Sequence, residues 1–212
     1  EIENIIPQAG DWKEIYIEQS ENSSFDNIVI RYAKYAMTIY NSEIDIRNID
    51  VEYGFTAFDV NAYSLVKAFN INIRNMIDDS IVLYENSLFE IENLSIENTD
   101  ADSAIVLFNK AFLSVENINI KNGTGSGIVL FNESTIDLAN GEISGFDYAG
   151  IEDYEGDESW GENKILLSKI EIKDNDYGLA IYSDKSIYGI EKSSIYDNKL
   201  FIYPTNSRNR FF

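Results

Sequence analysis

The sequence predicts an all-β protein built as a parallel β-helix, a solenoid in which each turn of the chain forms one rung. Its apolar residues alternate with polar ones in very short runs, which is the periodicity of strands. Isoleucine, valine, tyrosine and phenylalanine are frequent, and the 212 residues include only two prolines. The apolar runs also return at a nearly constant distance along the chain, which is typical of a repeat protein.

The repeat length can be read from the first apolar run of each repeat. The second apolar residues of successive runs lie 21, 22, 23, 24, 23, 29 and 23 residues apart, at Ile30, Val51, Ile73, Ile96, Ile120, Ile143, Ile172 and Ile195. This regularity predicts about eight stacked rungs, and strand spacings of about 4.8 Å would make them a rod roughly 40 Å long.

Each repeat holds two further runs. One begins with a small residue and ends with an aromatic, as in Ala104–Phe108, and another follows after a turn, as in Leu113–Val115. Each rung therefore has three short strands, too few to bury their inward faces alone, so stacking makes one continuous core. Leucine-rich repeats and β-propellers fit less well, because the chain lacks the leucine-rich pattern and hairpin turn signals are scarce.

Asparagine precedes the first run in six successive repeats, at Asn27, Asn48, Asn70, Asn93, Asn117 and Asn140. Asparagine tolerates left-handed backbone, and its amide can form hydrogen bonds along a stack. We therefore predict an asparagine ladder that stabilises the fold and carries no chemistry.

From Gly10 to about Tyr203, the repeats resemble those of right-handed parallel β-helix proteins of the pectin-lyase-like superfamily, in particular non-catalytic bacterial surface members. The segment around Trp12 is similar to the first rungs of bacterial members. The resemblance implies a single-stranded, right-handed β-helix. It says little about activity, because this fold supports lyases, hydrolases, epimerases, adhesins and phage spikes.

The resemblance also suggests how the chain is divided. We expect residues 1–25 to form a first rung and cap, 26–204 the repeats of a single domain, and 205–212 the start of a C-terminal segment. Both ends of the sequence look like cuts, so we expect the chain to be part of a longer polypeptide.

The charge and two missing residue types exclude several functions. The chain has 16 basic and 37 acidic residues and a formal net charge of −21, so we expect no nucleic acid or anionic membrane as a partner. Without histidine or cysteine, it can form no Ser-His-Asp or Cys-His catalytic site and no thiolate metal centre. No apolar run is long enough for membrane insertion.

Four aspartates are the catalytic candidates. Polygalacturonase-like hydrolases of the superfamily carry Asn-Thr-Asp, Asp-Asp, Gly-His-Gly and Arg-x-Lys in that order. This chain has Asp78 and Asp79 in one turn, and Asp100 and Asp102 in the equivalent turn of the next rung. The motif order is reversed, and Gly-His-Gly and Arg-x-Lys are absent, so a solvated acidic turn is the competing interpretation. Lyase chemistry would require clustered basic residues, and arginine is sparse.

One repeat is longer than its neighbours, with 29 residues from Ile143 to Ile172. Its extra length includes closely spaced oxygen ligands of the kind that Ca²⁺ prefers, at Asp153, Glu155, Asp157 and Glu158. Trp160 in the same segment could stack on a sugar ring. The competing interpretation is a solvated acidic bulge.

The aromatic residue that ends the second run recurs through the chain, and Phe108 and Phe131 are central examples. These rings either stack along a corner of the core or form an exposed apolar ribbon that binds a glycan or protein partner.

The sequence therefore favours a non-catalytic extracellular or cell-surface module, a stalk or adhesion element. It would bind carbohydrate or a surface protein. We expect it to need no cofactor, and Ca²⁺ is the one alternative. The alternatives are a polysaccharide-active lyase or hydrolase and a phage-spike or filament subunit.

Overall fold

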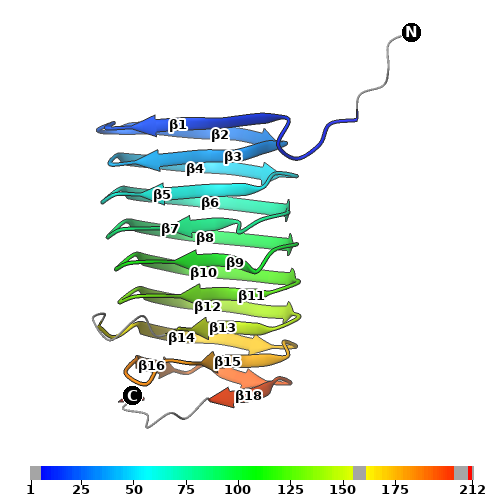
Figure 1. Ribbon diagram of the computed structural model, residues 1–212, viewed down its shortest axis with the longest axis vertical. Coiled ribbons are helices and arrows are strands. Elements are labelled where there is room, and N and C mark those ends of the chain that lie inside the picture. Colours follow the sequence, from blue (N-terminus) through cyan, green and yellow to red (C-terminus); the bar gives the residue numbers. More distant parts are fainter. Residues whose placement is uncertain (1–5, 155–160, 203–209, 212) are drawn as a thin grey trace.

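The computed structural model describes residues 6–154, 161–202 and 210–211. The chain winds into a parallel β-solenoid of about eight turns, and its strands lie one above another along the rod (Figure 1). The predicted all-β class is confirmed, and the architecture matches a right-handed parallel β-helix. Among the described residues, no helix is long and apolar enough to cross a membrane.

Two parallel sheets run along the rod. The first, which we call sheet A, contains β1 (Trp12–Glu18), β3 (Ala33–Tyr40), β5 (Thr56–Asn61), β7 (Ile81–Leu83), β9 (Ser103–Leu107), β11 (Ser126–Leu130), β13 (Ala149–Asp153), β15 (Tyr177–Ile181) and β18 (Lys199–Ile202). The second, sheet B, contains β2 (Ser23–Arg31), β4 (Glu43–Glu52), β6 (Leu65–Met76), β8 (Leu88–Thr99), β10 (Phe112–Gly123), β12 (Thr135–Phe146), β14 (Lys164–Lys173), β16 (Ile187–Glu191) and β19 (Arg210–Phe211). The short strand β17 (Ser194–Tyr196) also pairs with β14.

In the central rungs, two of the three predicted runs belong to one strand of sheet B. In β8, the runs Phe89–Ile91 and Leu94–Ile96 lie on either side of Asn93, which pairs in register with Asn117 of β10. Because the corner is so short, backbone pairing continues through it and the strand does not end there. These rungs therefore have the three expected runs, carried by two strands.

The predicted asparagine ladder is present in the middle of the rod. Each side-chain Nδ2 donates to Oδ1 of the asparagine one rung earlier, at 2.9 Å, through Asn117, Asn93, Asn70 and Asn48. Asn70 and Asn93 are half-buried, and each rung supplies the partners that their amides need.

At both ends, the ladder departs from the prediction because a different acceptor is in reach. Asn48 donates to Oδ1 of Asp26 at 2.9 Å, which leaves Asn27 outside the ladder. Asn140 donates to the backbone oxygen of Glu116 at 3.2 Å. Four of the six predicted members therefore form amide-to-amide bonds.

A second asparagine ladder, which we did not predict, lies near the carboxyl ends of the sheet B strands. Asn75, Asn98 and Asn122 have left-handed backbone, with φ of 57°, 59° and 60°. Asn98 Nδ2 donates to Oδ1 of Asn75 at 3.3 Å, and Asn122 Nδ2 donates to Oδ1 of Asn98 at 3.4 Å. Asparagine adopts left-handed φ more readily than most residues, so it suits both the corner and the stack.

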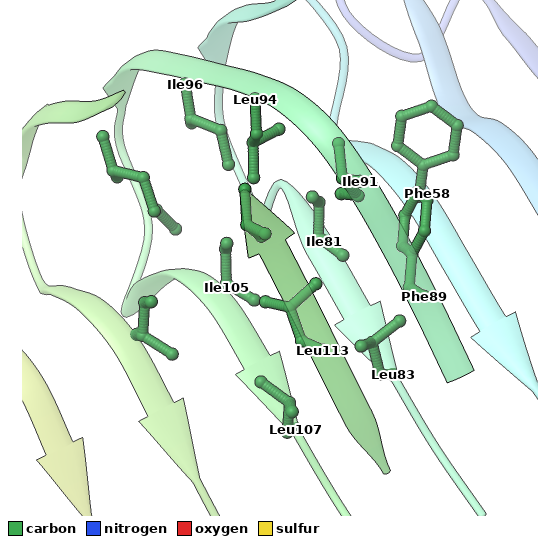
Figure 2. Close-up of a cluster of buried hydrophobic side chains, with 14 of the residues drawn as sticks. Phe58, Ile81, Leu83, Phe89, Ile91, Leu94, Ile96, Ile105, Leu107 and Leu113 are labelled. Atoms are coloured by element: carbon green, nitrogen blue, oxygen red, sulfur yellow. The ribbon is translucent and has the colours of Figure 1, made fainter. Parts of the chain in front are cut away.

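The core lies between the sheets and consists of aliphatic side chains stacked rung on rung. Figure 2 shows side chains from both sheets pointing into one interior, where Ile81, Leu83, Ile96, Ile105 and Leu107 are all fully buried. Burial of one such side chain contributes about 1.5–3 kcal/mol. Inward-facing rows of this kind hold the outward-facing residues of sheet A at fixed spacing.

Asn93→Ala should lower the free energy of unfolding by about 1–2 kcal/mol, because it removes one donated and one accepted amide bond. Asn119→Ala is the matched control, since Asn119 also faces outward on sheet B and no hydrogen bond is described for its side chain. Urea unfolding followed by circular dichroism measures both. Equal losses in the two variants would contradict a stabilising role for the ladder.

Candidate functional site

The outer face of sheet A carries a stripe of valines. Val82, Val106 and Val129 pair in register on β7, β9 and β11, and they face away from the main core. Their exposed fractions are only 8 %, 4 % and 6 %, because the neighbouring aromatic rings pack against them in a cluster separate from the main core. The stripe therefore forms an apolar floor on an outward-facing surface.

Five aromatic rings stack beside this floor, just beyond the carboxyl ends of the strands. They are Tyr84, Phe108, Phe131, Tyr154 and Tyr182. Successive ring centroids lie 4.8–5.1 Å apart and the ring planes are within 10° of parallel. Each inner ring therefore uses both faces on its neighbours and presents mainly its edge to solvent. All five side chains are half-buried.

A groove of about 480 Å³ lies on this face. Val106 and Val129 line its floor, and ring residues line the side at the carboxyl ends of the strands. Polar residues line the side at the amino ends, where the turns enter sheet A. The residues that line the groove are Asp79, Asp102, Ser103, Val106, Phe108, Gly125, Ser126, Val129, Phe131, Tyr148, Glu152 and Tyr154.

Asp79 is held at the groove by the next rung. Its Oδ1 accepts hydrogen bonds from the backbone nitrogen of Ser103 at 3.0 Å and from the Ser103 hydroxyl at 2.8 Å. Burial raises the pKa of Asp79, and the hydrogen bonds from Ser103 oppose that rise. The nearby charges of Asp78 and Asp102 raise the Asp79 pKa further.

Glu152 interrupts the valine stripe, because it pairs in register with Val129. Its side chain is only 6 % exposed, and its Oε2 accepts a hydrogen bond from the Ser126 hydroxyl at 2.7 Å. Burial raises the pKa of Tyr154, and the hydrogen bond between Tyr154 and Glu152 raises it further. The partners of this buried carboxylate are thus two hydroxyl groups.

The groove brings together four of the residues singled out from the sequence, which are Asp79, Asp102, Phe108 and Phe131. Two other candidates are exposed and do not line it. Asp78 Oδ1 accepts from the backbone nitrogen of Asp79 at 2.9 Å, and Asp100 Oδ1 accepts from the Thr124 hydroxyl at 3.3 Å. Phe108 and Phe131 form a stack, yet the stack lies on the outer face with its edges exposed, so features of both expected arrangements are present.

Sequence reasoning missed Ser103, Ser126, Tyr148 and Glu152. The signal for Glu152 was available, since it occupies the repeat position that holds valine in the three preceding rungs. The burial of Glu152 against Ser126 and Tyr154 depends on packing between rungs, which the repeat pattern does not display.

Asp153 lies at the end of β13 and points into the solenoid, where it is 1 % exposed. Its Oδ1 accepts from Nδ2 of Asn163 at 2.7 Å, and its Oδ2 accepts from the hydroxyl of Tyr188. It occupies the position of Leu130 in the preceding rung and is part of the strand, not of the insertion.

The other members of the expected Ca²⁺ site, Glu155, Asp157 and Glu158, lie outside the described residues, as does Trp160. Their roles stay predictions. Within the described ranges, no group of three or more acidic side chains could hold a metal ion.

A second hollow, of about 530 Å³, follows the asparagine ladder on sheet B. Its lining is mainly amide side chains, including Asn48, Asn70 and Asn93, and these already bond to one another. The sheet A groove combines apolar and ionisable groups, and it is therefore the stronger candidate site.

The buried pair of Tyr188 and Asp153 predicts a loss of stability in alkali. Burial and then the charge of Asp153 raise the pKa of Tyr188 above its ordinary value of about 10. A raised pKa favours folding below the unfolded-state pKa, and this contribution falls by about 1.4 kcal/mol per pH unit above about pH 10. Tyr188→Phe should reduce that slope, although it also removes a donor from Asp153 and lowers stability by about 1–3 kcal/mol below about pH 10, a deficit that shrinks as the pH rises further.

Urea unfolding on both sides of that pH measures the slope. Tyr63→Phe is the control, because the Tyr63 side chain is 72 % exposed. An unchanged alkaline slope in Tyr188→Phe would contradict the role of this hydroxyl.

The comparisons with known proteins agree with this fold. A family model described as "Right handed beta helix region" matches residues 14–160. No curated protein and no solved structure matched the chain. The family match spans more than half of the sequence, and the structure shows the same stacked rungs (Figure 1). The chain therefore belongs to the right-handed β-helix family.

Proposed function

We propose that the chain is a non-catalytic β-helix module of an extracellular or cell-surface protein, and that it binds a carbohydrate chain in the sheet A groove. The observation that supports this most directly is the groove's two-sided lining, with an apolar floor and a rim of hydroxyls and carboxylates. A pyranose ring has apolar faces and hydroxyl edges, so it complements such a lining. Ligand sites are commonly apolar with a few placed polar groups.

The shape of the groove favours an extended ligand. Its lining comes from four successive rungs, from the turn before β7 to β13. Three strand spacings of about 4.8 Å make roughly 15 Å along the rod, enough for a short run of sugar units. Because the inner rings offer edges only, we expect the sugar to lie on the valine floor and contact Phe108 and Phe131 from the side.

The proposed surface location rests on the resemblance to surface β-helix proteins and on the charge. A net charge of −21 keeps copies of an exposed rod apart and soluble. In this role the module would act as a stalk or adhesion element.

Polysaccharide hydrolysis is the second candidate, because Asp79 and Asp102 both line the groove. Glycoside hydrolysis needs one protonated and one ionised carboxyl group. The raised pKa of Asp79 suits the protonated role, and Asp102 supplies a second carboxyl group at the groove. Lyase chemistry has less support, because no lysine or arginine is among the described residues that line the groove.

Asp102→Trp tests the proposed binding site. Asp102 is exposed at the groove, so a bulky ring there should cover the entrance and weaken polysaccharide binding by at least about tenfold. Asp100→Trp is the matched control, because Asp100 is exposed in the same turn but does not line the groove. Calorimetric titration with a panel of neutral and charged oligosaccharides gives the affinities. Equal affinity in both variants would reject the groove as the site.

The same panel tests catalysis when products are analysed by mass spectrometry. We expect no shortened or unsaturated products. If products form and Asp79→Asn abolishes them while Asp78→Asn does not, the module is a hydrolase that acts at the groove. The control residue Asp78 is exposed and lies outside the groove lining.

Ca²⁺ is the one cofactor included in the proposal, through the acidic segment around Asp157. The titrations are therefore run with and without Ca²⁺. A requirement for Ca²⁺ that Asp157→Asn abolishes would place the ion in this segment.

A further inference from the structure

We infer that the glycan recognised by the sheet A groove carries protonated amines, as polymers of glucosamine or galactosamine do. This inference rests on the proposed function and narrows it to one chemical class. It follows from where the carboxylates of the groove lie and from which partners they have.

The charged side chains that line the groove are all acidic among the described residues. Asp79, Asp102 and Glu152 line it, and none of the described residues that line it is a lysine or an arginine. A uronic acid polymer would bring further carboxylates against these three, and it would lose hydration without gaining a cation. A neutral polymer would supply only hydroxyl groups.

Glu152 is the strongest reason for a cationic ligand. Its side chain is 94 % buried (6 % exposed), and the partners that hold it are the hydroxyls of Ser126 and Tyr154. No ion pair of Glu152 is found among the described residues. Burying a carboxylate without a cation is costly, and a protonated amine on the ligand would offset that cost.

Two half-buried carboxylates on the outer face of sheet B have basic partners. Glu52 accepts from Arg31 at 2.8 Å and also pairs with Arg74. Glu142 lies between Lys121 at 3.5 Å and Lys173 at 3.2 Å. The cations that sheet B provides from its own side chains are missing in the groove, where an incoming ligand can take their place.

The spacing of the carboxylates suits a polymer. Asp102 lies in the turn just before β9, and Glu152 lies on β13, two rungs further along the rod. Two strand spacings make roughly 10 Å. One sugar unit in an extended chain is about as long as one strand spacing, so amines on alternate units would face the two carboxylates in turn.

The test compares oligosaccharides of equal length that differ only in their nitrogen. The full chain is titrated in a calorimeter with a glucosamine oligomer, its N-acetylated counterpart and a cello-oligosaccharide, at mildly acidic pH and low salt. We expect the glucosamine oligomer to bind at least about tenfold more tightly than the other two. Added salt should weaken this binding, because it screens the charges.

Glu152→Gln should reduce the affinity for the glucosamine oligomer about tenfold and leave the N-acetylated oligomer unaffected. Glu142→Gln is the matched control, because it removes an acidic charge from sheet B, away from the groove. Asp102→Asn, at an exposed position, provides the same measurement if Glu152→Gln fails to fold.

The outcomes separate this inference from the proposed function. Equal or tighter binding of the N-acetylated or cello-oligosaccharide would overturn the inference while leaving the glycan module intact. Binding of no oligosaccharide would overturn both. Oligolysine bound as tightly as the glucosamine oligomer, with the same dependence on Glu152, would replace the glycan with a basic peptide and overturn the inference.

Discussion

Backbone pairing between successive rungs sets the residues of each sheet beside their counterparts one rung earlier. Along the rod, side chains of the same type therefore lie next to one another, as in the asparagine ladder, the valine stripe and the aromatic stack. The surface becomes a set of stripes, each with one chemical character. A site arises where one stripe changes character, and Glu152 at the end of three valines is the clearest example.

This constraint explains which features could be predicted from the sequence. The rung period, the core rows and the middle of the asparagine ladder depend on local periodicity, which the sequence displays. The groove depends on register between rungs. The equivalent turns of Asp79 and Asp102 are visible in the sequence, and so is the valine position of Glu152, but the burial of Glu152 against Ser126 and Tyr154 is not. Asp153 was expected in a loop because it begins an acidic run, yet its inward position in β13 is fixed by pairing with Leu130.

The two sheets use acidic residues in different ways. On sheet B, the half-buried carboxylates of Glu52 and Glu142 form ion pairs with basic side chains of neighbouring rungs. In the sheet A groove, Asp79 and Glu152 accept hydrogen bonds from hydroxyl and backbone groups instead. The carboxylates of the groove therefore have a different set of partners from those of Glu52 and Glu142.

The groove also has an evolutionary property that follows from its floor of one valine per rung. Duplication of a single repeat of about 23 residues would extend the floor and the ring stack by one unit each, and the flanking rungs would keep their contacts. Deletion of a repeat would shorten the groove in the same way. Related chains could therefore change the length of the ligand they accept through repeat number alone, without any substitution in the groove itself.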